Sequence, residues 1–208
     1  MAGQLVLLSG AWRPLAALLL ASTVIMGSPG PSTISATAMG AAFGVRRSLQ
    51  YVCGLIAGTI VVLLAVSVGV VALVVSVPHA AGALGVVSAV YILYLAFRIA
   101  TAPPLESRSG DPQAPAFAGG FLLACANPKA YLAIAAVYAG ATIFADDGAL
   151  DAIVKTALLC AMIVIIHLVW LLAGASLSRV LRDPVSSRFV NVVLAAALVV
   201  TTAAMLLR

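Results

Sequence analysis

Long apolar stretches separated by short polar segments make up most of the chain. The apolar stretches cover residues 14–44, 51–77, 80–101, 117–144, 152–175 and 190–207. Each has the length of a membrane-spanning helix, which needs about 20 mostly apolar residues. The pattern therefore predicts an all-α integral membrane protein with about six transmembrane helices.

One polar segment, residues 102–116, divides this pattern in the middle. It contains four prolines together with Glu106, Arg108 and Asp111. The sequence then predicts a first three-helix repeat at 1–101, a linker at 102–116 and a second three-helix repeat at 117–208. Because three spans is an odd number, the second repeat must lie upside down relative to the first. We therefore expect a 3+3 inverted repeat.

Composition leads to the same class of protein. Hydrophobic residues make up 64% of the chain and charged residues only 8%, whereas about a quarter of a soluble protein is charged. The net charge of +5 would suggest nucleic acid in a soluble protein. Here most of the arginines lie between apolar stretches, so we expect a lipid bilayer as the partner and no nucleic acid.

These basic residues also predict the orientation in the membrane. Seven fall in the first, third and fifth connections and three on the opposite side. The first group is Arg46, Arg47, Arg98, Arg108, Arg179, Arg182 and Arg188, and the second is Arg13, Lys155 and Arg208. Since basic loops stay inside, we expect the linker in the cytoplasm of a bacterial inner membrane and both termini outside it. Residues 15–26 resemble the apolar part of a secretory signal; we expect a retained helix, with processing as the alternative.

The first and fourth stretches are each interrupted by proline. The first contains Gly27-Ser28-Pro29-Gly30-Pro31-Ser32 and the fourth contains Asn127-Pro128-Lys129. Asparagine is a favoured N-cap and proline a favoured first helical residue, so a new half-helix should start at each break. Breaks at matching places in two halves are typical of transporters with a site near the membrane midplane. An ordinary proline kink is the alternative.

The chemistry at the breaks suits a zwitterion. A helix N-terminus attracts anions, and Lys129 adds a positive charge. The carbonyl groups near residues 26–27 and 125–126 would accept hydrogen bonds from an ammonium group. The predicted substrate-binding residues are Ser28, Pro29, Gly30, Pro31, Ser32, Asn127, Pro128 and Lys129, with Tyr91 and Tyr94 from the third stretch.

At these residues the sequence resembles the LysE/RhtB family of amino-acid exporters. The resemblance rests on Gly27-Ser28-Pro29-Gly30-Pro31, Gly40, Gly44, Arg46-Arg47, Gly54, Gly58, Gly69, residues 91–95, Gly120-Phe121-Leu122 and Asn127-Pro128-Lys129-Ala130. It implies export of an amino acid from the bacterial cytoplasm, driven by the proton motive force. Many relatives carry an ionisable residue where this chain has Thr59. This difference argues against proton coupling through a carboxylate at this position and against recognition of cationic substrates. Neutral or small amino acids are favoured.

His167 is an ionisable residue well inside the fifth stretch, and such residues are functional candidates. We predict a proton relay through His167 and Lys129, with a histidine satisfied by a helix carbonyl as the alternative. An intramembrane enzyme would need a partner such as Ser176, which is nine positions away on the same helix and out of reach. We therefore expect no catalytic residues, metal or cofactor. Export of another small solute or a metal cation is the first alternative, and a non-transport membrane protein is the second. The glycine-rich faces leave homo-oligomer formation open.

Overall fold

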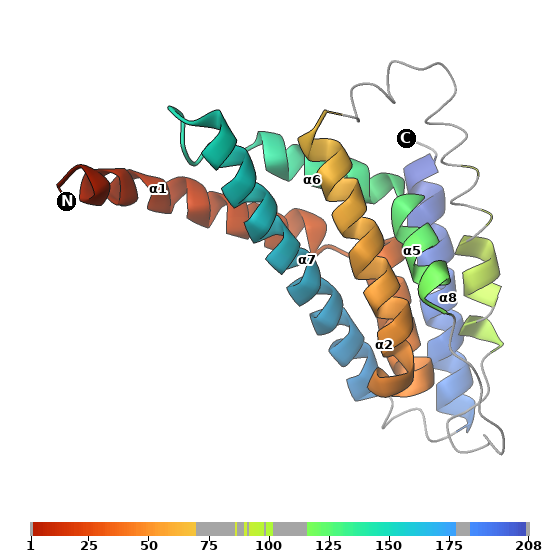
Figure 1. The fold of residues 1–208 in the computed structure, drawn as a ribbon. Helices are drawn as coiled ribbons and strands as arrows, with labels where there is room; N and C mark the ends of the chain where they lie inside the picture. Colours follow the sequence, from red (N-terminus) through yellow and green to blue (C-terminus); the bar gives the residue numbers. More distant parts are fainter. Residues whose placement is uncertain are drawn as a thin grey trace.

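The computed structural model describes residues 2–69, 86, 90, 92–97, 99–101, 116–177 and 184–206. In chain order its elements are α1 (Ala2–Ala21), the π-helix η1 (Ser22–Met26), α2 (Pro31–Ser67), α5 (Phe117–Cys125), α6 (Pro128–Ala139), α7 (Gly148–Leu177) and α8 (Pro184–Leu206) (Figure 1). All these elements are helical, so the predicted all-α class is confirmed for the described part of the chain.

Two of these helices, α2 and α7, are long and apolar enough to cross a bilayer. The pair α5 and α6 adds a third candidate span, bent by 61°. Two shorter apolar helical segments cover Trp12–Met26 and Arg188–Ala197. Half of the expected third span and almost all of the linker 102–116 lie outside the described residues. The arrangement of six spans as two inverted repeats therefore stays a prediction.

Helix α2 consists of two helical pieces, and the chain reverses direction between them at Gly44. This residue has φ 73° and ψ 171°, a backbone region that is essentially restricted to glycine. The hydroxyl of Ser48 holds the turn by donating to the carbonyl oxygens of Met39 at 2.8 Å and Gly44 at 2.7 Å. The pieces 31–43 and 45–67 consequently lie side by side (Figure 1). The expected loop between the first two stretches is a tight turn.

Both predicted helix breaks are present. The first covers residues 27–30, after which α2 begins at Pro31 with Gly30 as its N-cap. The second covers residues 126–127, where Asn127 caps α6. Local cap and proline chemistry predicted a new half-helix at each break, with Ser28-Pro29 and Gly30-Pro31 both possible at the first; the structure has the starts at Pro31 and Pro128.

The boundary between the fourth and fifth stretches differs from the prediction. Helix α6 ends at Ala139 rather than near 144, and α7 begins at Gly148 rather than 152. Asp147 explains the early start of α7, because its carboxylate accepts a hydrogen bond from the N–H of Leu150 at 3.0 Å. An aspartate in this position stabilises a helix N-terminus.

The second piece of α2 crosses α5 with the two backbones in contact. A Cβ atom added to Gly54 would lie 2.1 Å from the carbonyl oxygen of Phe117, and one added to Gly120 would lie 2.1 Å from that of Tyr51. Small residues permit this close approach between membrane helices. The glycines in the sequence pattern thus serve packing within one chain.

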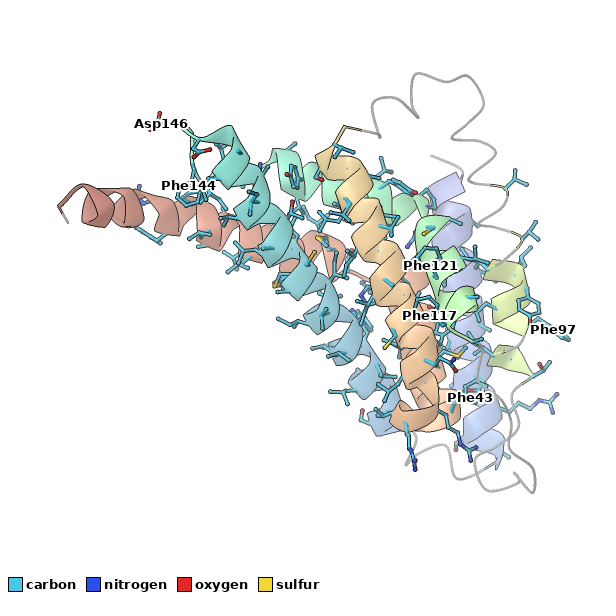
Figure 2. The ribbon with its side chains drawn as sticks, in the orientation of Figure 1. Phe43, Phe97, Phe117, Phe121, Phe144 and Asp146 are labelled. Carbon is cyan, nitrogen blue, oxygen red and sulfur yellow. The ribbon has the colours of Figure 1, made fainter. Side chains whose placement is uncertain are left out.

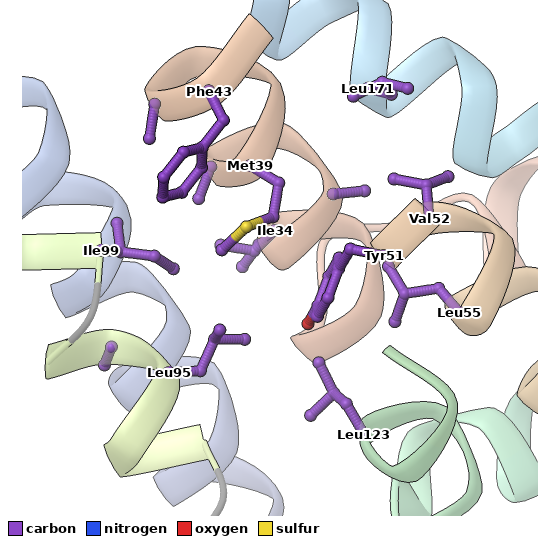
Figure 3. Packing of buried hydrophobic residues seen from close by; sticks show 14 of the residues in the cluster. Ile34, Met39, Phe43, Tyr51, Val52, Leu55, Leu95, Ile99, Leu123 and Leu171 are labelled. Atoms are coloured by element: carbon purple, nitrogen blue, oxygen red, sulfur yellow. The ribbon is translucent and has the colours of Figure 1, made fainter. Parts of the chain in front are cut away.

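The buried core lies between these helices in two clusters. One cluster contains Met39, Tyr51, Leu55 and Leu123, which point toward each other from α2 and α5 (Figure 3). The second surrounds Leu63 and Ile163 on α2 and α7. Large apolar side chains also cover the outer surface, which is expected where lipid replaces water. They include Val61, Leu64, Leu122, Leu132, Ile153, Ile165 and Leu172.

Candidate substrate-binding site

The two helix breaks lie against each other, although they are about a hundred residues apart in the chain. The Nδ2 group of Asn127 donates a hydrogen bond to the hydroxyl oxygen of Ser32 at 2.9 Å. The ammonium group of Lys129 donates to the carbonyl oxygens of Ser28 and Pro29, the latter at 2.8 Å. These bonds bring together the residues that the sequence pattern assigned to one site.

Asn127 connects the break in its own helix to the other break. Its Oδ1 atom accepts a hydrogen bond from the N–H of Lys129 at 3.1 Å, which is the N-cap interaction of α6. Its Nδ2 group makes the bond to Ser32, and the residue is only 3% exposed. One side chain therefore both starts α6 and positions α6 against the start of α2.

Gly30 provides the space that the Lys129 side chain occupies. A Cβ atom added to Gly30 would lie 2.6 Å from the Cδ atom and 2.8 Å from the Nζ atom of Lys129. The N–H of Gly30 donates to the hydroxyl oxygen of Thr33 at 2.9 Å, so α2 is capped from within. The start of α2 thus presents backbone rather than side chain to the lysine.

Other helices hold the carbonyl groups at the breaks. The indole N–H of Trp170 on α7 donates to the carbonyl oxygen of Gly27 at 3.0 Å, and the hydroxyl of Tyr131 on α6 donates to that of Cys125 at 2.9 Å. From the sequence, these carbonyl groups were predicted to bind a substrate ammonium. In the structure both already accept a hydrogen bond from the protein, because α7 and α6 pack directly against the breaks.

A cavity lies beside the paired breaks. The lining residues are Met26, Gly30, Ser32, Thr33, Thr59, Asn127, Lys129, Ala130, Ala133, Ile134, Ile163, Ile166 and His167. Apolar side chains supply much of the wall, and Lys129 contributes a positive charge. None of the described residues in this wall is an aspartate or a glutamate.

His167 borders the cavity from α7 and is only 4% exposed. Its Nδ1 atom lies 2.8 Å from the carbonyl oxygen of Ile163, one turn earlier in the same helix. Its Nε2 atom is buried and has no hydrogen-bond partner among the described residues. The imidazole therefore makes a hydrogen bond through Nδ1, and its Nε2 has no partner among the described residues.

The remaining predicted residues divide into three groups. Pro31 and Pro128 start their half-helices beside the cavity, and Ser28 and Pro29 supply the carbonyl groups that bind Lys129. Tyr94 is 49% exposed and is not part of the cavity wall. Tyr91 lies outside the described residues. The roles assigned to both tyrosines stay predictions.

Several residues of the cavity wall were not predicted from the sequence. Thr33 was not assigned to the site, and Thr59 was noted only as a departure from the resembled family. Ile163 and Ile166 were not considered, although Ile163 lies one helical turn before both His167 and Ile166, at spacings of four and three. Helical spacing around His167 was the available signal.

A second buried group of charges lies near the start of α7. The ammonium group of Lys155 is 2.8 Å from the carboxylate of Asp151 and donates to the carbonyl oxygen of Ala141 at 3.1 Å. Asp151 also accepts from the N–H groups of Ile143 and Phe144, at 2.6 and 3.1 Å. These contacts fasten the segment between α6 and α7. Among the described residues, no cluster of histidine, cysteine and acidic side chains has the composition of a metal site.

Comparison with known proteins shows one family. The model of the LysE type translocator family matches residues 23–208. The cysteine/O-acetylserine efflux proteins of Salmonella choleraesuis (strain SC-B67) and Salmonella typhimurium are each 32% identical over 174 residues, which cover 83% of this chain and 87% of theirs. No solved structure matches. The chain is therefore a member of the LysE type translocator family.

Proposed function

We propose that this protein is a secondary transporter that exports a small, neutral amino acid or a close derivative from the bacterial cytoplasm. Membership of a translocator family makes it a membrane transport protein and not an enzyme. The observation that carries the proposal is the cavity beside the two paired breaks, with Lys129 in its wall. The cavity combines one cationic group with a mostly apolar lining.

The breaks provide donors for the carboxylate of an amino acid. An ammonium group has three N–H donors, and two of those of Lys129 bind the carbonyl oxygens of Ser28 and Pro29. The third donor is available to a ligand in the cavity. The first turn of α2 adds backbone N–H groups without partners inside the helix, together with the positive end of the helix dipole. Lys129 therefore both fixes the first break and attracts an anion.

The rest of the cavity favours a short, uncharged side chain. The apolar wall residues Ile134, Ile163 and Ile166 would contact such a side chain without satisfying a charge. A lysine or arginine side chain would meet no carboxylate among the described wall residues, and burying an unpaired charge is costly. The relatives' names specify cysteine and O-acetylserine, which are small and uncharged in the side chain. We propose substrates of this size and charge for the present protein.

The proposal includes the overall arrangement and the energy source. It places six spans in two inverted repeats in the bacterial inner membrane, with both termini outside the cytoplasm. It also includes coupling to the proton gradient, with His167 and Lys129 as the groups that exchange protons. The breaks at corresponding places in the two halves support the inverted repeat, and the buried position of His167 supports its role.

Uptake of labelled amino acids by inverted membrane vesicles tests this proposal. We expect uptake of a small neutral amino acid that depends on an imposed proton gradient and is lost in Lys129→Ala. Arg13→Gln is the matched control, because Arg13 is exposed and lies outside the cavity wall. Absence of uptake across a panel of neutral amino acids and O-acetylserine would contradict the proposed function, as would normal uptake by Lys129→Ala.

A further inference from the structure

The imidazole of His167 has a defined proton arrangement in this structure. Its Nδ1 atom lies 2.8 Å from a carbonyl oxygen, which can only accept a hydrogen bond. A neutral imidazole carries a proton on one nitrogen and a lone pair on the other. The proton therefore resides on Nδ1, and Nε2 presents a lone pair.

This lone pair is an unused, buried acceptor on a residue that lines a cavity. Nε2 has no partner in the described part of the chain, and the residue is 4% exposed. Buried polar atoms are nearly always hydrogen-bonded, so an exception calls for a specific explanation. His167 and Ile163 both line the cavity beside the helix breaks. A donor that enters this cavity is the simplest missing partner.

The distribution of donors and acceptors around the cavity indicates which donor this is. Lys129 and the start of α2 present donors, which suit a carboxylate. The carbonyl oxygens of Gly27 and Cys125 already accept hydrogen bonds from Trp170 and Tyr131. An amino acid also carries an ammonium group that must be satisfied on leaving water. Among the acceptors of the cavity wall, Nε2 of His167 is a buried one without a partner in the described residues.

We propose that Nε2 of His167 accepts a hydrogen bond from the α-ammonium group of the substrate and so selects substrates with a free amino group. This inference rests on the proposed function, because it places the amino acid in the same cavity. It makes His167 a specificity-determining residue in direct contact with the substrate. A hydrogen bond to a charged group of this kind corresponds to about tenfold or more in affinity.

Competition in inverted vesicles tests this role. For labelled cysteine, we would compare inhibition by unlabelled cysteine, by its N-acetyl derivative and by its methyl ester, keeping the thiols reduced. In the wild type we expect the N-acetyl derivative to compete about tenfold or more weakly than cysteine. His167→Leu should bring these two inhibition constants close together, and His167→Gln, which keeps an acceptor, should retain part of the difference. The methyl ester should stay a weak competitor in both variants.

A purely structural role for His167 predicts another result. In that case His167→Leu would lower the uptake of labelled cysteine but leave the ratio of the inhibition constants of cysteine and its N-acetyl derivative unchanged. An unchanged ratio would overturn the inference. Leu168→Ala is the control, because Leu168 is the next residue of α7 and faces outward. If the wild type takes up no amino acid, the proposed function itself fails, and this outcome differs from an unchanged ratio.

A spectroscopic measurement on the wild type keeps the test valid if His167→Leu does not fold. The chain contains two histidines, so ¹⁵N-labelled histidine gives few imidazole signals, and His79→Gln assigns those of His167. We expect saturating cysteine to shift the Nε2 resonance of His167 and the N-acetyl derivative to leave it in place. An Nε2 resonance that does not respond to cysteine would overturn the inference.

Discussion

At the scale of single residues, the site depends on a few polar contacts between the two breaks. Lys129 and Asn127 reach from one break to the backbone and side chain of the other. Gly30 matters because of the lysine beside it rather than because of its own conformation. Its φ of −172° is extended backbone that an alanine adopts without strain. A substitution at Gly30 therefore tests the contact with the Lys129 side chain and not the backbone conformation of the glycine.

We predict that Gly30→Ala reproduces much of the transport defect of Lys129→Ala. The new methyl group would occupy the position of the Lys129 side chain, 2.6 Å from its Cδ atom. The ammonium group would have to leave the carbonyl oxygens of Ser28 and Pro29. Initial uptake rates in vesicles measure the effect. Gly148→Ala is the matched control, because a Cβ atom there meets nothing within 4 Å; a normal rate in Gly30→Ala would contradict the prediction.

The hydrogen bond between Asn127 and Ser32 should appear as coupling between the two residues. We expect Ser32→Ala and Asn127→Ser to be non-additive by about 1 kcal/mol in apparent substrate affinity, since each removes the same bond. Asn127→Ser is chosen because serine retains N-cap ability. Asn127→Ala should be worse than Asn127→Ser because it also loses the cap of α6. Fully additive effects would show that the bond does not link the breaks.

The polar part of the site could be predicted from the sequence only where its chemistry is local. Asn127 followed by proline defines a helix start within a few residues, and the structure has that start. The partners of Lys129 and Trp170 depend on how helices pack, which no local pattern specifies. The carbonyl groups expected to bind substrate were for this reason found already bonded at Gly27 and Cys125.

At the scale of elements, the turn at Gly44 decides how the first half-helix meets the second stretch. Apolar length predicted both stretches, but it could not show that they would join through one residue without a loop. The backbone of Gly44 combines positive φ with extended ψ, and the hydroxyl of Ser48 bonds across the turn. This turn places residues 31–43 antiparallel to 45–67 (Figure 1) and so positions the start of α2 at the cavity.

We predict that Gly44→Ala destabilises the protein by about 1–3 kcal/mol, which is the typical cost of this backbone region for a residue with a side chain. The cause is backbone strain, because a Cβ atom at Gly44 meets nothing within 4 Å. Gly44→Asn should not rescue stability, since asparagine tolerates the left-handed helical region but not this one. Thermal unfolding in detergent measures the effect, with Gly148→Ala as control. Equal melting temperatures for all variants would contradict the prediction.

At the scale of the whole molecule, the charged ends indicate how the protein lies in the membrane. Phe43, next to the turn that leads to Arg46 and Arg47, lies at the opposite end of the structure from Asp146 (Figure 2). A basic end and an acidic end separated along the long helices agree with the orientation expected from loop charges. The sequence could predict this separation because charge and span length suffice for it. The arrangement of all six spans depends in addition on residues 70–85, which the structure does not describe.

Cysteine labelling at the two ends tests the orientation. In a background where Cys53, Cys125 and Cys160 are replaced, we predict that Asp146→Cys reacts with a membrane-impermeant maleimide in intact cells stripped of their outer membrane. Arg46→Cys should react only after the inner membrane is opened, because positively charged connections remain in the cytoplasm. Both side chains are exposed in the structure, so access to the reagent depends on the side of the membrane rather than on burial. The reverse labelling pattern would invert the topology, and the cavity would then have to be loaded from the opposite face. Retained uptake in inverted vesicles by both variants is the control that the labelled protein is folded.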